Sequence, residues 1–264
     1  VTGQPNAMGG REVGGLANML ASHMELANPE HRALVQEFWG SPIIADKPGL
    51  KALELFEAIH AGQVKAVWIM ATNPVDSLPE ADFVREALAK CPLVVVSDIT
   101  PSTDTADLAH VLLPTDGWGE KDGVVTNSER RISRQKSFLA SPGEAKPDWW
   151  QLCEVAKRMG FGQAFDYAGP WEIFAEYAAS TALGNEGNRD LDISGLSTLD
   201  RAAFDALEPL QWPYPAGAER QETRFFAEGG FYTEDARANF IPTPYRAPMA
   251  LSLIHISEPT RLAT

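Results

Sequence analysis

Three short, almost entirely apolar segments constrain the fold of this chain more than any other feature. They cover residues 65–70, 93–96 and 111–113, and they lack the polar alternation of a strand that has one face in water. Continuous apolar strands are typical of parallel sheets that are covered on both faces. Residues 79–90, between the first two segments, carry apolar side chains at helical spacing. The alternation predicts an α/β fold, a parallel sheet with flanking helices.

The rest of the chain divides by composition at about residue 185. Beyond that point Gly, Pro and Asp become more frequent. We therefore predict an α/β region over 1–184 and an arm of helix and loop, leading into a linker, over 185–250. Periodicity and turn residues predict further elements in the first region: helices over 30–39, 50–60 and 171–182, a helix capped by Asp148, a helical turn over 105–109, an extended excursion over 124–135 and a glycine-rich loop over 8–15.

The charge balance limits the partners of the chain. It has 22 Lys and Arg against 36 Asp and Glu, a net charge of -14. Such a field repels polyanions, so we expect neither nucleic acid nor an anionic membrane surface as a partner. An anionic ligand would need a local cluster of donors. No run of about 18 apolar residues occurs, so we expect no membrane insertion.

The two cysteines, Cys91 and Cys153, cannot by themselves hold an iron–sulfur cluster or a structural zinc ion. We expect both to be buried free thiols in helical segments, which fits the reducing cytoplasm. The histidines have no metal-ligand spacing, so we predict no metal ligand in this chain.

Polar residues that could bind a nucleotide follow the predicted strands. Asn73 follows the first strand, Ser97 and Asp98 close the second, and Lys121 comes after the third. Ligands of α/β sheets bind beyond the carboxyl ends of the strands, where a carboxylate can accept from a ribose diol. The alternative is that Asn73 and Asp98 only form turns.

Three arginines allow two interpretations each. Arg11, in the predicted glycine-rich loop, could bind an anion through its planar guanidinium or form a salt bridge with an acid such as Glu12. Arg130 and Arg131 could clamp a phosphate or lie on a solvated strand face.

Both ends of the chain are unusual. The first five residues, Val-Thr-Gly-Gln-Pro, are typical of the middle of a loop. Residues 251–264 begin Leu-Ser-Leu-Ile-His-Ile-Ser-Glu-Pro-Thr-Arg, which we interpret as the translation of a sequencing adapter, the alternative being a genuine strand. We therefore expect an internal fragment of a longer protein.

Several segments together resemble one family. They are 2–14 (TGQPNAMGGREVG), 71–74 (ATNP), 95–98 (VVSD), 118–123 (WGEKDG), 126–131 (TNSERR) and 142–149 (PGEAKPDW). Across residues 1–250 the chain resembles the molybdopterin oxidoreductase superfamily, and the first segment is similar to that of bacterial assimilatory nitrate reductases. The resemblance implies the dinucleotide-binding α/β fold of that superfamily over residues 1–184.

The resemblance also implies the cofactors and their contacts. The family carries Mo-bis(molybdopterin guanine dinucleotide) and one [4Fe–4S] cluster, and its nitrate reductases reduce nitrate to nitrite. Gln4 and Arg11 match residues near the molybdenum on the substrate side. The positions that match contacts to the guanine dinucleotides are Asn73, Ser97, Asp98, Lys121 and Asp148.

Parts of the family pattern are missing from the chain. The cysteines that bind the cluster and the molybdenum would precede Val1, and a C-terminal β-barrel domain would follow. We therefore expect the fragment alone to be inactive and to need the rest of its chain. The electron donor would be a ferredoxin or an NADH-linked reductase. The alternatives are a related enzyme, such as a formate dehydrogenase alpha subunit, and a stand-alone nucleotide-binding module.

Overall fold

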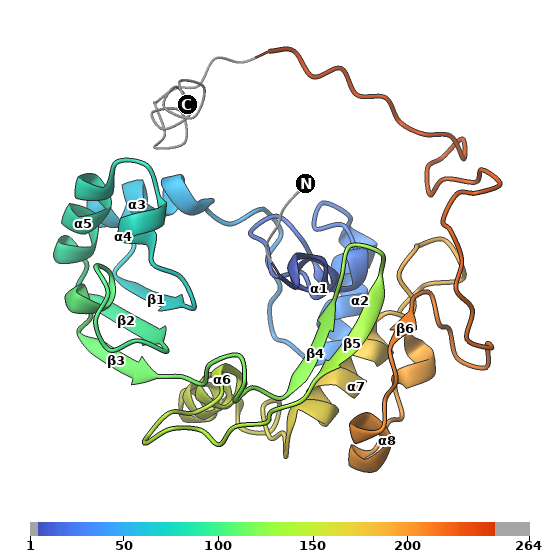
Figure 1. Ribbon diagram of the computed structural model, residues 1–264. Helices are drawn as coiled ribbons and strands as arrows, with labels where there is room; N and C mark the ends of the chain where they lie inside the picture. Colours follow the sequence, from blue (N-terminus) through green and yellow to red (C-terminus); the bar gives the residue numbers. More distant parts are fainter. Residues whose placement is uncertain (1–4, 246–264) are drawn as a thin grey trace, which may run out of the picture. The chain divides into compact units, whose positions relative to one another are not determined.

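The computed structural model describes residues 5–245, which form parts of two compact units. Of the described residues, unit 1 combines 5–49 with 116–238, and unit 2 combines 50–115 with 239–245. Figure 1 labels the helices and strands of each unit. The units do not divide at residue 184, so the sequence-based boundary does not coincide with the compact units of the structure.

Unit 2 contains the predicted parallel sheet. Its strands β1 (Ala66–Met70), β2 (Leu93–Asp98) and β3 (Val111–Pro114) lie in the order β1-β2-β3, and both pairs are parallel. Helices α3 (Ala52–His60), α4 (Pro74–Ser77) and α5 (Ala81–Lys90) accompany the sheet, with a short 3-10 turn η2 (Ala106–Leu108) before β3. The predicted α/β fold with a parallel sheet is confirmed.

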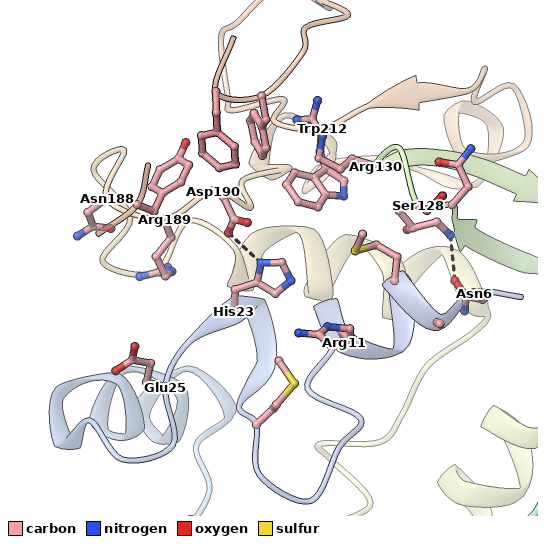
Figure 2. A pocket seen from close by; sticks show the side chains of 18 of the residues that line it. Asn6, Arg11, His23, Glu25, Ser128, Arg130, Asn188, Arg189, Asp190 and Trp212 are labelled. Carbon is pink, nitrogen blue, oxygen red and sulfur yellow. Dashed lines mark hydrogen bonds and ion pairs between the residues drawn. The ribbon is translucent and has the colours of Figure 1, made fainter. Parts of the chain in front are cut away.

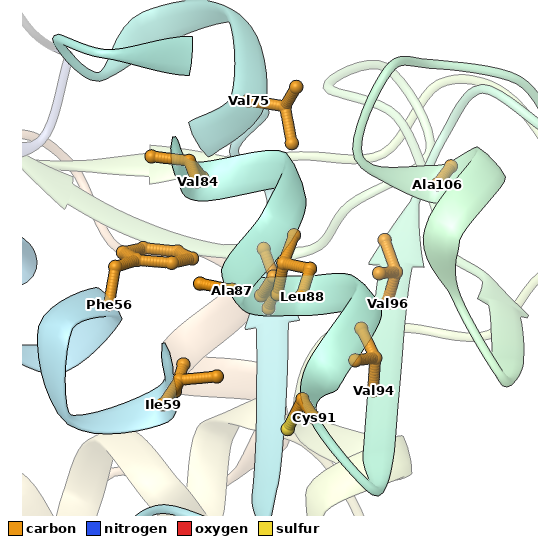
Figure 3. Close-up of a cluster of buried hydrophobic side chains, with 11 residues drawn as sticks. Phe56, Ile59, Val75, Val84, Ala87, Leu88, Cys91, Val94, Val96 and Ala106 are labelled. Atoms are coloured by element: carbon orange, nitrogen blue, oxygen red, sulfur yellow. The ribbon is translucent and has the colours of Figure 1, made fainter. Parts of the chain in front are cut away.

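The core of unit 2 lies on one face of this sheet. Figure 3 shows side chains of α3, α5 and β2 converging, among them Phe56, Leu88 and Val96. We expected the strands to be covered on both faces, but Val95 is only half-buried and Val111 is exposed. The physical reason is that α3 and α5 pack into the same core, so these helices leave the other face of the sheet uncovered.

Unit 1 is built around an antiparallel sheet. The predicted extended excursion is a hairpin of β4 (Gly123–Thr126) and β5 (Arg131–Gln135), and β6 (Leu210–Gln211) pairs with β5. The other elements are α1 (Ala7–Glu12), η1 (Ala21–His23), α2 (Pro29–Trp39), α6 (Asp148–Ala156), the π-helical η3 (Lys157–Phe161), α7 (Pro170–Ser180), η4 (Ser194–Leu196) and α8 (Arg201–Asp205).

The core of unit 1 joins the two regions that composition separated. Ile132 of β5 and Phe174 of α7 pack in one cluster with Leu191, Phe204 and Trp212. The stretch from 191 to 212 is therefore part of the core and not an arm. Its Gly, Pro and Asp residues lie in turns between the buried apolar residues, and this composition is typical of a linker.

Two local predictions in unit 1 were wrong. The glycine-rich stretch that contains Arg11 is the helix α1 and not a loop. Asn6 precedes it in a left-handed conformation, φ 57°, and its side-chain oxygen accepts a hydrogen bond from the Thr126 amide at 2.9 Å. This long-range contact sets the start of α1, and sequence spacing cannot show it. Asp148 is the first residue of α6, and Pro147 stands at the cap.

Other features of the described residues agree with the sequence. Cys91 and Cys153 are buried free thiols. Within residues 5–245, the helices are too short or too polar to cross a lipid bilayer.

Candidate functional site

A cavity of about 1180 Å³ lies in unit 1. Figure 2 shows it between α1, η1, the β4–β5 turn and the segment around residue 189. Its walls combine charged, aromatic and sulfur-containing side chains. Among the residues that line it are Arg11, Met19, His23, Glu25, His31, Arg130, Arg189, Asp190 and Trp212.

The charges of this cavity oppose the charge of the chain. Arg11, Arg130 and Arg189 line it together with two acids, Glu25 and Asp190. With both histidines neutral, the side chains that line the cavity carry a net charge of +1, whereas the whole chain carries a net charge of -14. A local excess of cations in a negative protein is what an anionic ligand requires.

Arg11 is a positively charged side chain of this cavity that is not bonded to the described part of the protein. Its side chain is exposed on α1, lines the cavity and makes no hydrogen bond or ion pair with any residue that the structure describes. The alternative of a salt bridge with Glu12 was wrong, because Glu12 is directed into the core. The Arg11 guanidinium therefore keeps its donors for a ligand.

Glu12 is a buried carboxylate beside the cavity. Its residue is 1% exposed, and it accepts hydrogen bonds from Thr126 Oγ1 at 2.9 Å, Tyr177 OH at 3.1 Å and Trp212 Nε1 at 2.7 Å. Burial raises the pKa of Glu12 above its ordinary value, and the three donors oppose that rise. Burial raises the pKa of Tyr177 as well, and the adjacent Glu12 raises it further. Glu12 thus ties α1 to β4, α7 and Trp212.

His23 and Asp190 form a pair on the wall of the cavity. His23 Nδ1 lies 2.8 Å from Asp190 Oδ1, as the dashed line in Figure 2 shows. Burial alone would raise the pKa of Asp190, but the hydrogen bond and charge of His23 hold that pKa below its ordinary value. Asp190 is therefore a carboxylate that fixes the orientation of the ring.

The second histidine of the cavity is held differently. His31 Nδ1 accepts a hydrogen bond from the Glu25 amide at 2.9 Å. Burial, together with the charge of Arg189, lowers the pKa of His31. His31 is thus a neutral acceptor near neutral pH.

Arg130 fits neither of its two interpretations, because its guanidinium is used inside the protein. The residue is 8% exposed and donates to the backbone oxygens of Trp212 at 2.7 Å and Thr223 at 2.5 Å. Its guanidinium carbon lies 3.5 Å from the centroid of the Phe225 ring, a cation–π contact. Burial lowers the pKa of Arg130. Arg131, in contrast, pairs at the surface with Glu129 and Glu222.

Unit 2 brings Asn73, Ser97 and Asp98 to the carboxyl edge of its parallel sheet. Met70 pairs in register with Ser97, and Asp98 with Pro114. The Asn73 side-chain oxygen accepts from Thr105 Oγ1 at 2.6 Å, and Asp98 Oδ1 accepts from the Thr100 amide at 3.0 Å.

These contacts leave part of the edge available. Ser97 Oγ accepts from Trp68 Nε1 at 2.8 Å. Asn73 Nδ2 donates no hydrogen bond within residues 5–245. Asp98 forms the local turn bond of the alternative interpretation, whereas Asn73 bonds to Thr105, 32 positions away, and both keep atoms that a nucleotide could use.

Unit 1 brings Lys121 and Asp148 together. Lys121 Nζ lies 2.6 Å from Asp148 Oδ2, and each side chain is little more than a quarter exposed. A ligand that bound to either residue would meet both. The last predicted site residue, Gln4, lies outside the described residues.

Sequence reasoning missed His23 and Asp190. The spacing of the histidines indicates no site, and 167 positions separate His23 from Asp190. Only the pairing of η1 with the segment around residue 190 reveals the site, so no local pattern could have found it.

Known proteins resemble this chain over most of its length. Residues 4–158 match the family model described as "Molybdopterin oxidoreductase". The chain is 52% identical to "Nitrate reductase" of Klebsiella oxytoca over 92% of its length and 27% of that protein. It is 50% identical to "Nitrate reductase" of Shewanella frigidimarina, over 91% of the chain and 26% of that protein.

More distant relatives have other activities in their names. The "F420-dependent formate dehydrogenase subunit alpha" of Methanocaldococcus jannaschii is 30% identical over 92% of the chain and 33% of that protein. The structure of "Acetylene Hydratase from Pelobacter acetylenicus" matches with a TM-score of 0.52 at 22% identity, over 80% of this chain and 28% of that one, which shows a shared fold. The chain thus spans about a quarter to a third of the proteins it matches. With more than half of its residues inside the matching model, the chain belongs to the molybdopterin oxidoreductase family.

Proposed function

We propose that the chain is part of a molybdenum-dependent nitrate reductase that reduces nitrate to nitrite. The observation that carries the proposal is the free Arg11 guanidinium in a locally cationic cavity of a chain with a net charge of -14. Nitrate is planar, with one negative charge and three equivalent oxygens. A guanidinium can meet two of those oxygens with parallel N–H groups. The 52% and 50% identity to nitrate reductases supports the same substrate.

Within this proposal, Arg11 binds and orients nitrate. Gln4 is assigned to the same site by the family resemblance alone. The other two arginines of the wall are bonded to backbone oxygens, so Arg11 is the main electrostatic attraction for the anion.

The residues of both units fit the chemistry of a molybdopterin guanine dinucleotide. The Asp98 carboxylate suits a ribose diol, and the free amide of Asn73 suits a phosphate or a base edge. Ser97 stands on the same edge. Lys121 suits a phosphate, and the Asp148 carboxylate suits the two adjacent N–H groups of guanine. When bound, the cofactor supplies the two electrons that nitrate reduction consumes, while the protein binds and positions.

The electron path and setting are also part of the proposal. Electrons would arrive through a [4Fe–4S] cluster from a ferredoxin or an NADH-linked reductase, in the cytoplasm, during nitrate assimilation. Residues 1–184 would carry most of the dinucleotide contacts, residues 185–250 would lead toward a β-barrel domain, and residues 251–264 would be a translated adapter.

A formate dehydrogenase is the second candidate, because a relative with that name is 30% identical to the chain. Formate is also a small planar anion, and Arg11 would suit it. The difference between 52% and 30% identity favours nitrate.

The experiment is to express the complete reading frame with its cofactor and to assay nitrate reduction and formate oxidation with an artificial electron carrier. We expect turnover with nitrate alone. Turnover of formate without reduction of nitrate would overturn the assignment.

A further inference from the structure

One histidine presents an unpaired nitrogen to the cavity that Arg11 faces. His23 uses Nδ1 for Asp190, and Nε2 has no hydrogen-bond partner within residues 5–245. The side chain is 19% exposed, so the protein covers most of the ring. Helix α1 contacts η1, and Figure 2 shows the Arg11 and His23 side chains in one cavity.

The backbone holds this ring in place at some energetic cost. Ser22 and His23 are both left-handed, with φ 61° and 56°. Such conformations are unfavourable for non-glycine residues and persist only where the surroundings enforce them. Ser22 is fully buried, with its Oγ 2.8 Å from Ser180 Oγ. The edge contact of the His23 ring with Trp212, at 5.8 Å between centroids, fixes the ring further.

The other cations of the cavity are committed. Arg130 donates to two backbone oxygens, as described above. The terminal nitrogens of Arg189 donate to the backbone oxygens of Thr181, Leu183 and Gly184. Among the cationic side chains of the cavity, Arg11 is therefore the one left for an anion, and His23 Nε2 becomes a second charged donor when the ring is protonated.

We propose that His23, positioned by Asp190, binds the oxyanion of this cavity together with Arg11, and that binding takes up one proton onto His23. A neutral His23 that donates through Nδ1 to Asp190 presents a lone pair at Nε2, which repels an anion. The imidazolium presents N–H at both nitrogens, so Nε2 becomes a charged donor. The proton comes from solvent and stays on Nε2 while the anion is bound. The identity of the oxyanion, nitrate, rests on the proposed function.

Charged and titratable groups surround His23 on several elements. Asp190 is bonded to the ring, the buried Glu12 carboxylate interacts with it electrostatically, and Glu25 lines the same cavity. The charged and titratable groups near the ring and on the wall of the cavity are Arg11 and Glu12 on α1, Glu25 and His31 after η1, Arg130 in the β4–β5 turn, Tyr177 on α7, Arg189 with Asp190, and Tyr232. An anion bound at Arg11 adds a negative charge beside His23, and that charge couples proton uptake to binding.

The test is calorimetric titration of nitrate into the complete, oxidised enzyme. Running it in two buffers with different ionisation enthalpies, Tris and Mops at constant chloride, counts the protons taken up per nitrate. We expect uptake that approaches one proton at mildly alkaline pH. The nitrate Kd should rise about tenfold for each pH unit over that range, the behaviour of one linked proton.

Matched variants separate this role from a structural one. His23→Gln should abolish proton uptake, flatten the pH dependence and weaken nitrate binding at pH 6.5 by about tenfold or more. His31→Gln, at the other histidine of the cavity, should leave proton uptake unchanged. Asp190→Asn keeps the hydrogen-bond acceptor and removes the charge, so the pH of half-maximal uptake should fall. Molybdenum content and circular dichroism check that each variant is folded and loaded.

The outcomes distinguish the two proposals. Nitrate binding without proton uptake in the wild-type enzyme, or unchanged uptake in His23→Gln, overturns this inference and leaves the proposed function standing. If His23→Gln does not fold, an unchanged uptake profile in Asp190→Asn overturns it instead. No saturable nitrate binding at any pH overturns the proposed function itself.

Discussion

Replacing Glu12 perturbs the hydrogen-bonded centre of unit 1. Alanine at this position would leave the Trp212 indole N–H without an acceptor, since a ring nitrogen cannot turn away as a hydroxyl can. The Thr126 and Tyr177 hydroxyls would lose their acceptor as well. A buried donor left unpaired costs about 1–3 kcal/mol, and the cavity left by the side chain adds to that cost. We expect Glu12→Ala to destabilise unit 1 by about 3–4 kcal/mol.

Glutamine should behave differently, because the geometry of the site suits an amide. Its oxygen can accept from Trp212, and its NH₂ group can donate to the hydroxyls of Thr126 and Tyr177, which are able to accept. The substitution also removes a carboxylate whose burial is unfavourable, as the raised pKa of Glu12 shows. We expect Glu12→Gln to lie within about 1 kcal/mol of the wild type at neutral pH.

The comparison between the wild type and Glu12→Gln also predicts a pH dependence. Because the folded protein binds the Glu12 proton more tightly than the unfolded chain does, this group stabilises the fold fully below its ordinary pKa of 4.5. That stabilisation is lost as the pH rises through the raised pKa. The stability of the wild type relative to Glu12→Gln should therefore fall between about pH 4.5 and neutrality.

Hydrogen exchange measured by mass spectrometry on the complete protein is the suitable assay, since it reports the opening of α1 and α7 without assuming two-state unfolding of the whole. If Glu12→Gln opened these helices as readily as Glu12→Ala, the negative charge and not the hydrogen-bond geometry would stabilise the site. The same protection difference at pH 4.5 and pH 7.5 would refute the raised pKa.

Substitutions at three further residues, Arg11, Asp98 and Lys121, test the proposed binding roles in the complete enzyme. In steady-state kinetics, Arg11→Ala should lower kcat/KM for nitrate about ten- to a hundredfold while the molybdenum content stays normal. Arg11→Lys should lower kcat/KM less, and the surface variant Arg131→Lys serves as the control. Asp98→Ala should weaken dinucleotide retention by about 1–3 kcal/mol, measured as guanine nucleotide per protein after dialysis, and full retention would exclude the ribose contact. Lys121→Met breaks a partly exposed ion pair, so it should change the free energy of unfolding by no more than about 1 kcal/mol. The molybdenum content of the purified enzyme should fall. An unchanged molybdenum content would show that the ion pair is only structural.

The parallel sheet could be predicted because its strands are continuous apolar runs. Val94 and Val96 are fully buried, and Leu93 and Val95 beside them are apolar as well. The sequence could not show which residues of each strand are covered by the helices of unit 2. Val111 is as apolar as Val94 and yet exposed, because no described helix packs over it. Apolar character specifies that a residue is suited to burial, and only the packing shows what buries it.

The residues of the candidate site also differ in how far the sequence could predict them. Lys121 and Asp148 were both expected at a cofactor, and the structure joins them by an ion pair. Each lies in a segment that carries the family resemblance, and their contact with a cofactor stays a prediction. The His23–Asp190 pair lies in no such motif, and it depends on a contact between distant segments and on two left-handed residues that no propensity favours. Long-range pairs of this kind are beyond local sequence reasoning.

The neighbours Arg11 and Glu12 show how local structure decides the chemistry. In a loop, adjacent opposite charges can pair, and that was one of the two interpretations of Arg11. In a helix, successive side chains point about 100° apart, so two adjacent residues do not face each other. Because residues 7–12 are helical, Glu12 enters the core and Arg11 faces the cavity. The helix thus separates a carboxylate that holds the fold from a guanidinium that is left for a ligand, and the anion site follows from that separation.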